Sequence, residues 1–335
     1  MGTDETDPVA AESDNRDLYE IASWEDRSLL DRVSVAIYRW GIRAVKILVV
    51  LLALLVLVAV GGLSFLREPL IGVLTVFSAI PALLLAGYVW HSDITESEPI
   101  SLLAATFLLG VLTAGFAAVL NGLLQPIFTT LGAIGMVLFF YLIVGPVEET
   151  VKLLAVVFYA YNDERFAAVI DGAVYGAIAG LGFATIENAI YISRAVGEIG
   201  NLSLGLGLIG VGDDITATRA LAGPGHVVYS TFAGYYLGLA KFNPENRGPI
   251  IIKGLIIAAL IHATYNTTVG IGSGLIRSVT GLPQLAAFFI YVALYVGGFG
   301  YLLYRKIQRY RRAYRSSHSA ETGKEEKSTA DDEIK

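Results

Sequence analysis

Residues 131–158 read LGAIGMVLFFYLIVGPVEETVKLLAVVF, and the only charged residues among them are Glu148, Glu149 and Lys152. A helical crossing of the hydrocarbon core needs about 20 apolar residues, so this stretch predicts a membrane span. Ionisable side chains within a span are costly and usually functional. Each of two adjacent carboxylates there needs a partner or a proton. The stretch therefore predicts both a membrane-embedded fold and a candidate site.

The composition of the whole chain agrees with a membrane protein. Hydrophobic residues make up 55% of the chain, charged residues make up 16%, and the mean hydropathy is +0.62, far from the usual soluble balance. Eight apolar stretches are candidate spans, at residues 45–66, 70–90, 100–123, 130–159, 166–192, 226–239, 249–271 and 282–304. We expect an all-α fold, a polytopic transmembrane bundle of about eight helices in the cell membrane. Pro146 predicts a kink in the fourth span, because proline removes a backbone donor.

Positive charges predict the orientation of the bundle. Lys and Arg in short flanks of spans remain cytoplasmic. They cluster before the first span and after the last, at Arg39, Arg43, Lys46, Arg305, Lys306, Arg309, Arg311, Arg312 and Arg315. We therefore expect both termini in the cytoplasm. Residues 1–30 and 311–335 are polar and charged, which predicts disordered tails around a bundle at 31–310. The lipid bilayer is the expected partner, and no nucleic-acid-binding pattern appears.

Glycines recur at helical spacing in three of the predicted spans. Small residues four apart allow neighbouring helices to approach closely. The pattern appears as Gly172, Gly176 and Gly180, as Gly234 and Gly238, and as Gly270 and Gly274. We expect these positions to be helix contacts.

Polar residues recur at spacings of three or four in four successive spans, which places the members of each set on one helix face. The sets are Glu148, Glu149 and Lys152; Phe183, Glu187 and Asn188; His226 and Ser230; and His262 and Asn266. Each set also has a structural interpretation, as a buried ion pair that fixes helix register or as interhelical hydrogen bonds. The four sets together favour a site, and we expect Glu149 and His262 to converge.

The combination suits hydrolysis of an amide. The chain has no cysteine, which excludes a cysteine nucleophile and a thiolate zinc site. One Glu can accept a proton from water, histidines can hold a metal or polarise a carbonyl, and Asn266 can donate to an oxyanion. Lys152 would keep one of the two glutamates ionised. Whether Glu148 or Glu149 is the base stays open.

The motifs Glu148-Glu149-x-x-Lys152, Phe183-x-x-x-Glu187-Asn188, His226 and His262-x-x-x-Asn266 resemble those of the PrsW family of intramembrane proteases. That family is related to the type II CAAX prenyl endopeptidases and the bacteriocin-processing enzymes. The resemblance covers residues 139–268, so we expect a protease core at about 130–271. Lys152 and Glu187 stand where the CAAX branch has an arginine at longer spacing and a histidine, which favours PrsW.

The resemblance implies an endopeptidase that cleaves membrane-anchored proteins, with Glu148 or Glu149 activating water. The expected catalytic residues are Glu148, Glu149, Lys152, Glu187, His226, His262 and Asn266, supported by Phe183, Asn188 and Ser230. Glu187, His226 and His262 are one possible ligand set for zinc or another divalent metal. A metal-free glutamate mechanism is the alternative. A proton-coupled transporter and a noncatalytic scaffold are alternative functions.

Overall fold

The structure is a computed structural model that describes residues 17–61, 63, 66, 68–95, 98–199 and 215–332, with only the backbone described at 197–199 and 317–332. Backbone contacts divide the chain into two compact units, Met1–Leu55 and Val56–Lys335. The larger unit contains every residue of the predicted site. Residues 1–16 of the predicted N-terminal tail lie outside the described residues.

The described chain is helical and forms no strand, in agreement with the predicted fold class. Seven helical segments are long and apolar enough to cross a membrane. The helices are α2 (Leu29–Ala59), α3 (Pro69–His91), α4 (Ile100–Thr129), α5 (Gly132–Phe139), η2 (Phe140–Val144), α6 (Gly145–Phe158), η3 (Ala160–Asn162), α7 (Val169–Ile199), α8 (Ile215–Lys241), η5 (Pro244–Asn246), α9 (Arg247–Thr280) and α10 (Gln284–Asp332). The last helix continues through most of the stretch expected to be a tail, 311–335.

Helix α8 differs most from its predicted span. We predicted a start at residue 226, but the described helix already begins at Ile215. It is not among the seven apolar segments, although it is largely buried against α7, α9 and α3. A helix covered by other helices has no need of a lipid-facing apolar surface, so hydropathy alone understates its length.

The fourth predicted span changes its helix type just before Pro146, where a disruption was predicted. The segment is a short α-helix, α5, followed by the π-helical turn η2, and α6 begins at Gly145 and Pro146. The N–H groups of the first helical turn have no intrahelical acceptor, so a proline there, which has no N–H, costs no hydrogen bond. A π-helical turn changes the direction of the side chains that follow. The break therefore sets the helical phase in which α6 presents Glu148 and Glu149.

Two of the predicted glycine sets bring α7 and α8 into close contact. A Cβ at Gly172 would lie 2.3 Å from the Gly234 carbonyl oxygen, and one at Gly176 would lie 2.3 Å from that of Ser230. A Cβ at Gly180 would lie 2.6 Å from the carbonyl oxygen of His226. These contacts hold the backbone that carries His226 against α7.

The third glycine set was predicted wrongly. A Cβ at Gly270 or at Gly274 would meet nothing within 4 Å, so these positions are not helix contacts in the described structure. The spacing alone cannot tell which face of α9 meets a neighbour. Within the larger unit, α9 packs on α8, α6 and α10 through other residues.

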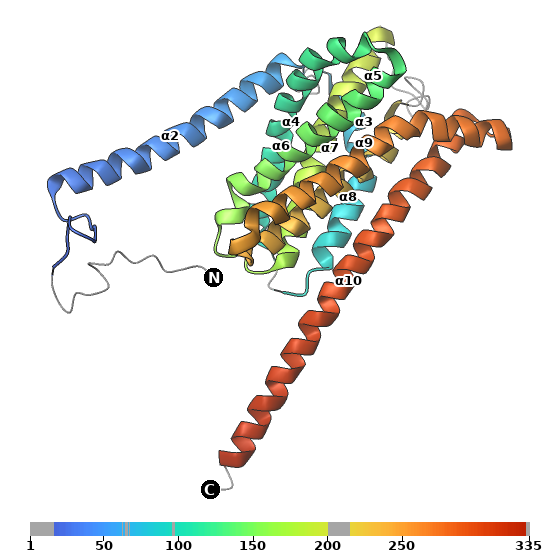
Figure 1. Cartoon of the computed structure of the whole chain (residues 1–335). Helices are drawn as coiled ribbons and strands as arrows, with labels where there is room; N and C mark the ends of the chain where they lie inside the picture. The colour runs from blue at the N-terminus through green and yellow to red at the C-terminus, as the bar shows by residue number, and fades with distance from the viewer. Residues whose placement is uncertain are drawn as a thin grey trace. The chain divides into compact units, whose positions relative to one another are not determined.

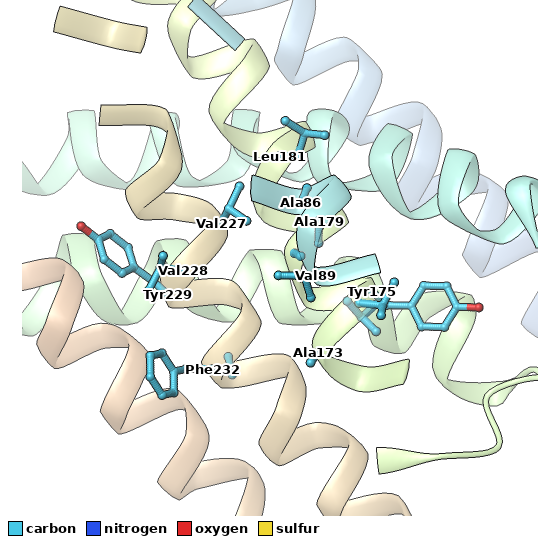
Figure 2. Close-up of a cluster of buried hydrophobic side chains, with 14 of the residues drawn as sticks. Ala86, Val89, Ala173, Tyr175, Ala179, Leu181, Val227, Val228, Tyr229 and Phe232 are labelled. Carbon is cyan, nitrogen blue, oxygen red and sulfur yellow. The ribbon is translucent and has the colours of Figure 1, made fainter. Parts of the chain in front are cut away.

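The apolar core is centred on α7 and α8, which lie side by side in the bundle (Figure 1). Figure 2 shows part of it, with α3 contributing Ala86 and Val89 and α7 and α8 contributing most of the rest. Many large apolar side chains of α3, α4 and α9 are instead exposed, for example Leu84 at 69% and Ile271 at 72%. Such an exterior suits contact with lipid.

Candidate active site

Glu149 lies at the centre of the predicted residues, and its side chain is fully buried. Its Oε1 lies 2.8 Å from Lys152 Nζ and 2.9 Å from His262 Nδ1. Its Oε2 accepts a hydrogen bond of 3.2 Å from Ser230 Oγ. The convergence of Glu149 and His262 predicted from the sequence is confirmed. Both oxygens of Glu149 are engaged, so this carboxylate is a fixed acceptor that joins α6, α8 and α9.

Lys152 connects the first motif to the histidine of α8. Its Nζ lies 2.8 Å from His226 Nδ1 and 4.2 Å from the centre of the Phe183 ring. An ammonium group only donates, so His226 Nδ1 is the acceptor. A neutral His226 therefore carries its proton on Nε2, which lies 2.9 Å from Glu187 Oε2. Phe183 supports both groups, because its ring centre also lies 5.5 Å from that of His226.

His262 has the opposite arrangement of its two nitrogens. Its Nδ1 faces the ionised Glu149 and so donates. The lone pair is then on Nε2, which lies 3.8 Å from Glu148 Oε2. The His262 ring stacks on Tyr229, with centroids 5.0 Å apart, and meets the His226 ring edge-on at 5.1 Å. These contacts fix the orientation of both imidazoles.

Glu148 has one carboxylate oxygen available. Its Oε1 accepts a hydrogen bond of 3.0 Å from Asn121 Nδ2. Its Oε2 is buried and accepts no hydrogen bond from any described residue, and it lies 3.8 Å from Lys152 Nζ and from His262 Nε2. A buried carboxylate oxygen without a partner is costly, so it suggests a group that binds there.

Glu187 and Asn188 are organised by Arg219, which precedes the span predicted at residues 226–239. Arg219 Nη2 donates to Glu187 Oε2, and its Nε donates to Asn188 Oδ1 at 2.8 Å. Its guanidinium also lies over the Tyr191 ring, 4.4 Å from the centre. Asn188 in turn donates to Ser78 Oγ of α3 at 3.0 Å. Asn188 is therefore a structural link, and Arg219 is the cationic partner of Glu187.

These side chains surround a cavity of about 450 Å³. Glu148, Glu187, His226, His262 and Asn266 line it, whereas Glu149, Lys152 and Ser230 lie behind it. The apolar part of the wall is formed by Met136, Phe139, Phe140, Val144, Phe183 and Ile190 among others. The cavity thus combines a small polar group with an apolar wall, as binding sites for partly apolar ligands do.

The donor atoms suit a divalent metal ion. One ligand atom each from Glu148, His226 and His262 lies within 4.8 Å of the other two, among the residues that the structure describes. Two imidazoles and a carboxylate are a known ligand set of catalytic zinc. The second nitrogen of a histidine ligand commonly donates to a carboxylate, which orients the ring. Glu149 accepts in this way from His262 Nδ1. Glu148 Oε2, which accepts no hydrogen bond from the described residues, is the oxygen that could bind the ion. Glu187, predicted as the third ligand, is bound by Arg219 instead.

Three residues near the site were not predicted from the sequence. Asn121 has a second amide, Gln125, four residues later in α4, but Gln125 lies beyond the span predicted at residues 100–123, so the two were not grouped as a polar set. Arg219 precedes the predicted start of its helix, so its position in the bundle was missed. Tyr229 has the spacing of a core residue, and its ring contacts with His262 and His226 connect it to the site.

Comparisons with known proteins agree with the motifs. A model of the family described as "PrsW family intramembrane metalloprotease" matches residues 98–297. Protease PrsW of Clostridioides difficile is 29% identical over 196 residues, which are 58% of this chain and 77% of that protein. Protease PrsW of Geobacillus kaustophilus is 30% identical over 194 residues, 56% of this chain and 75% of that protein. Protease PrsW of Bacillus subtilis is 28% identical over 188 residues. No solved structure matches the chain.

Proposed function

The chain belongs to the PrsW family of intramembrane metalloproteases and is a membrane peptidase, and from that premise we propose that it is an endopeptidase that cleaves membrane-anchored proteins in the cavity described above. The observation that carries this proposal is Glu148 Oε2, which is buried beside two oriented histidines and accepts no hydrogen bond from the described residues. The transporter and scaffold alternatives are not needed to explain that arrangement.

Glu148, His226 and His262 would hold the metal ion. Such an ion lowers the pKa of water and polarises the scissile carbonyl. The fit requires the neutral His226 to carry its proton on Nδ1 and to offer the Nε2 lone pair to the ion, so Lys152 Nζ would no longer donate to Nδ1. Glu187 Oε2 would then lose the His226 contact and keep the one with Arg219.

Glu187 is the carboxylate that we assign to proton transfer. It lines the same cavity and its side chain is 20% exposed there, whereas both oxygens of Glu149 are engaged. Arg219 keeps it ionised, which is the form that accepts a proton. Glu187 takes the proton of the attacking water as the new carbon–oxygen bond forms. It then gives the proton to the amine nitrogen as the peptide bond breaks.

The remaining residues hold this arrangement. Glu149 orients His262 and Asn121 orients Glu148, while Lys152 balances the charge of the two glutamates. Asn266 lines the cavity on the same helix as His262, one turn further on. Its amide is the donor that we assign to the oxyanion formed from the scissile carbonyl. The apolar wall suits the side chains of an unwound membrane segment.

A reconstituted assay tests this function. The purified chain is placed in liposomes with single-span membrane proteins extracted from cells that lack it, and new protein N-termini are identified by mass spectrometry. The wild-type chain should create termini that H262A and E187Q do not create. Termini that appear equally with all three proteins would contradict the proposal.

A further inference from the structure

A second group of carboxylates lies at the other end of α7, far from the active site. It consists of Asp93 and Glu98, from the connection between α3 and α4, and Asp171 in the first turn of α7. One carboxylate oxygen from each lies within 4.8 Å of the other two. Asp171 precedes Glu187 by sixteen residues of one helix, about 24 Å along its axis. The charge pattern predicts that this end faces the cytoplasm.

The three carboxylates have no cationic partner among the described residues. The nearest positive side chains are engaged elsewhere: Arg165 donates to Asp163 at 2.7 and 2.9 Å. Lys241 Nζ donates to the backbone carbonyl of Tyr161 at 2.8 Å and lies 3.3 Å from that of Asp163. Mutually repelling charges in a buried place need a counter-charge or a proton.

Hydrogen bonds satisfy only part of the group. Asp171 Oδ2 accepts from the backbone N–H groups of Ala167 and Ala168, at 2.7 and 2.8 Å. Thr95 Oγ1 donates to Asp93 Oδ1 at 2.7 Å, and the Tyr175 hydroxyl donates to Glu98 Oε2. These bonds fix the three carboxylates in place.

Two oxygens remain without a partner. Glu98 is only 4% exposed, and its Oε1 is buried without a hydrogen bond from any described residue. Asp93 Oδ2 is likewise buried and unpartnered. An unsatisfied buried carboxylate oxygen in a rigid group of three carboxylates points to a ligand that is positively charged.

We propose that Asp93, Glu98 and Asp171 bind a divalent hard cation, Ca²⁺ or Mg²⁺. Sites built from carboxylate oxygens alone are what these ions select, whereas zinc and copper sites include nitrogen or sulfur ligands. The ion ties the connection between α3 and α4 to the first turn of α7, the helix that carries Glu187. It stabilises the bundle at this end and does not take part in peptide hydrolysis, so the proposal is independent of the proposed function.

Thermal unfolding of the detergent-purified full chain tests the proposal. The protein is stripped with EDTA, and CaCl₂ or MgCl₂ is titrated against KCl of equal ionic strength. A ligand that binds only the folded state raises Tm with its concentration. We expect a saturable rise with one of the two divalent salts and none with KCl. Wild-type protein that does not respond to either divalent salt would overturn the proposal.

Variants locate the effect. E98Q keeps an acceptor for Tyr175 but removes a charge, and it should abolish the rise in Tm. E164Q removes an exposed acid in the segment before α7 and should leave the rise intact. H262A removes a proposed ligand of the active-site metal, and the rise should persist in it. A rise that survives in E98Q, or that disappears in H262A and not in E98Q, would show that the ion binds elsewhere.

Direct binding gives a second measurement. Tb³⁺ replaces Ca²⁺ in oxygen sites and luminesces when a nearby tyrosine is excited, and Tyr175 contacts Glu98. Wild-type protein and E164Q should give luminescence that Ca²⁺ competes away, Y175F should give less of it, and E98Q should give none that Ca²⁺ competes away. Equal luminescence from wild type and E98Q would contradict the proposed site.

Discussion

His262 Nδ1 lies 2.9 Å from Glu149 Oε1, and this contact joins α9 to α6 across 113 residues of chain. The carboxylate also accepts from Lys152 and Ser230, so it connects three helices at one point. Because Glu149 is fully buried and has no oxygen to spare, its role is to position His262. The two adjacent glutamates therefore have different roles. Glu148 lines the cavity, and Glu149 links α6, α8 and α9 by hydrogen bonds.

Neutralising Glu149 should therefore affect stability as well as activity. E149Q leaves the buried Lys152 ammonium without its carboxylate, and loss of one partner of a buried pair costs about 3–5 kcal/mol. Thermal unfolding in detergent should show a lower Tm. The double variant E149Q/K152M removes both charges and should recover much of the Tm while remaining inactive. A double variant as unstable as E149Q would show that Lys152 is not the group left unpaired.

Metal content should distinguish ligands from the proton acceptor. The purified wild-type chain should retain a divalent ion at the active site, and E148Q and H262A should lose it, as measured by mass spectrometry of the elements. E187Q should retain the ion, whereas its turnover should fall roughly 10²–10⁴-fold, the usual value of a general base. E164Q is the control for the removal of an acid. An E148Q protein that keeps the ion, or an E187Q protein that loses it, would contradict the assigned roles.

The close contact of α7 and α8 gives a matched pair of glycine variants. In G176A the new Cβ would lie 2.3 Å from the Ser230 carbonyl oxygen, so backbone must move. Overpacking of this kind costs about 1–3 kcal/mol. G270A introduces the same methyl group where nothing lies within 4 Å, and its Tm should be at least that of the wild type, because Ala favours a helix over Gly. Equal Tm values for the two variants would show that the helices are less closely packed than described.

The sequence predicted the parts of the site that depend on spacing along a helix. Glu148 and Lys152 share a face because they are four residues apart, and the break at Pro146 follows from its missing backbone donor. We expected the four polar sets to converge because an isolated polar group is costly in a membrane. These inferences need only local geometry and the cost of burial.

Other features depend on which helix covers which, and spacing does not contain that information. Helix α8 starts earlier than predicted because its first part is covered by protein and need not be apolar. Arg219 consequently fell outside the predicted span at residues 226–239, although it binds Glu187 and Asn188. Glu148 takes the place of Glu187 in the proposed ligand set, because the pairing of Glu187 with Arg219 depends on helix packing that spacing does not show. At Gly270 the four-residue glycine spacing predicted a helix contact, but nothing lies within 4 Å of a Cβ built there.

The pH dependence of stability should report on Glu98 when no divalent cation is present. Burial raises the pKa of the Glu98 carboxyl to about 8; the Tyr175 hydrogen bond opposes this, the charges of Asp171 and Asp93 add to it, and Arg165 opposes it. The folded chain then holds a proton that the unfolded chain releases above its ordinary pKa of 4.5. Stability from this group is present at low pH and is lost as pH rises toward about 8.

The difference between wild type and E98Q isolates that contribution. In EDTA, the Tm of the wild type minus that of E98Q should decrease between about pH 5 and pH 8, the window between the two pKa values. Asp93, Asp171, Tyr175 and Arg165 are common to both proteins, so their own titration largely cancels. A difference that is constant over this range would mean that Glu98 titrates normally.

The central claim is that Glu148 and Glu187 act in one peptidase site. The most direct measurement compares intact and cut forms of all single-span membrane proteins in cells expressing wild-type chain, E148Q, E187Q or E164Q, at equal abundance of the chain in the membrane. We predict a set of fragments that is present with wild type and E164Q and absent with both active-site variants. Persistence of the same fragments in E148Q and E187Q cells would contradict the account.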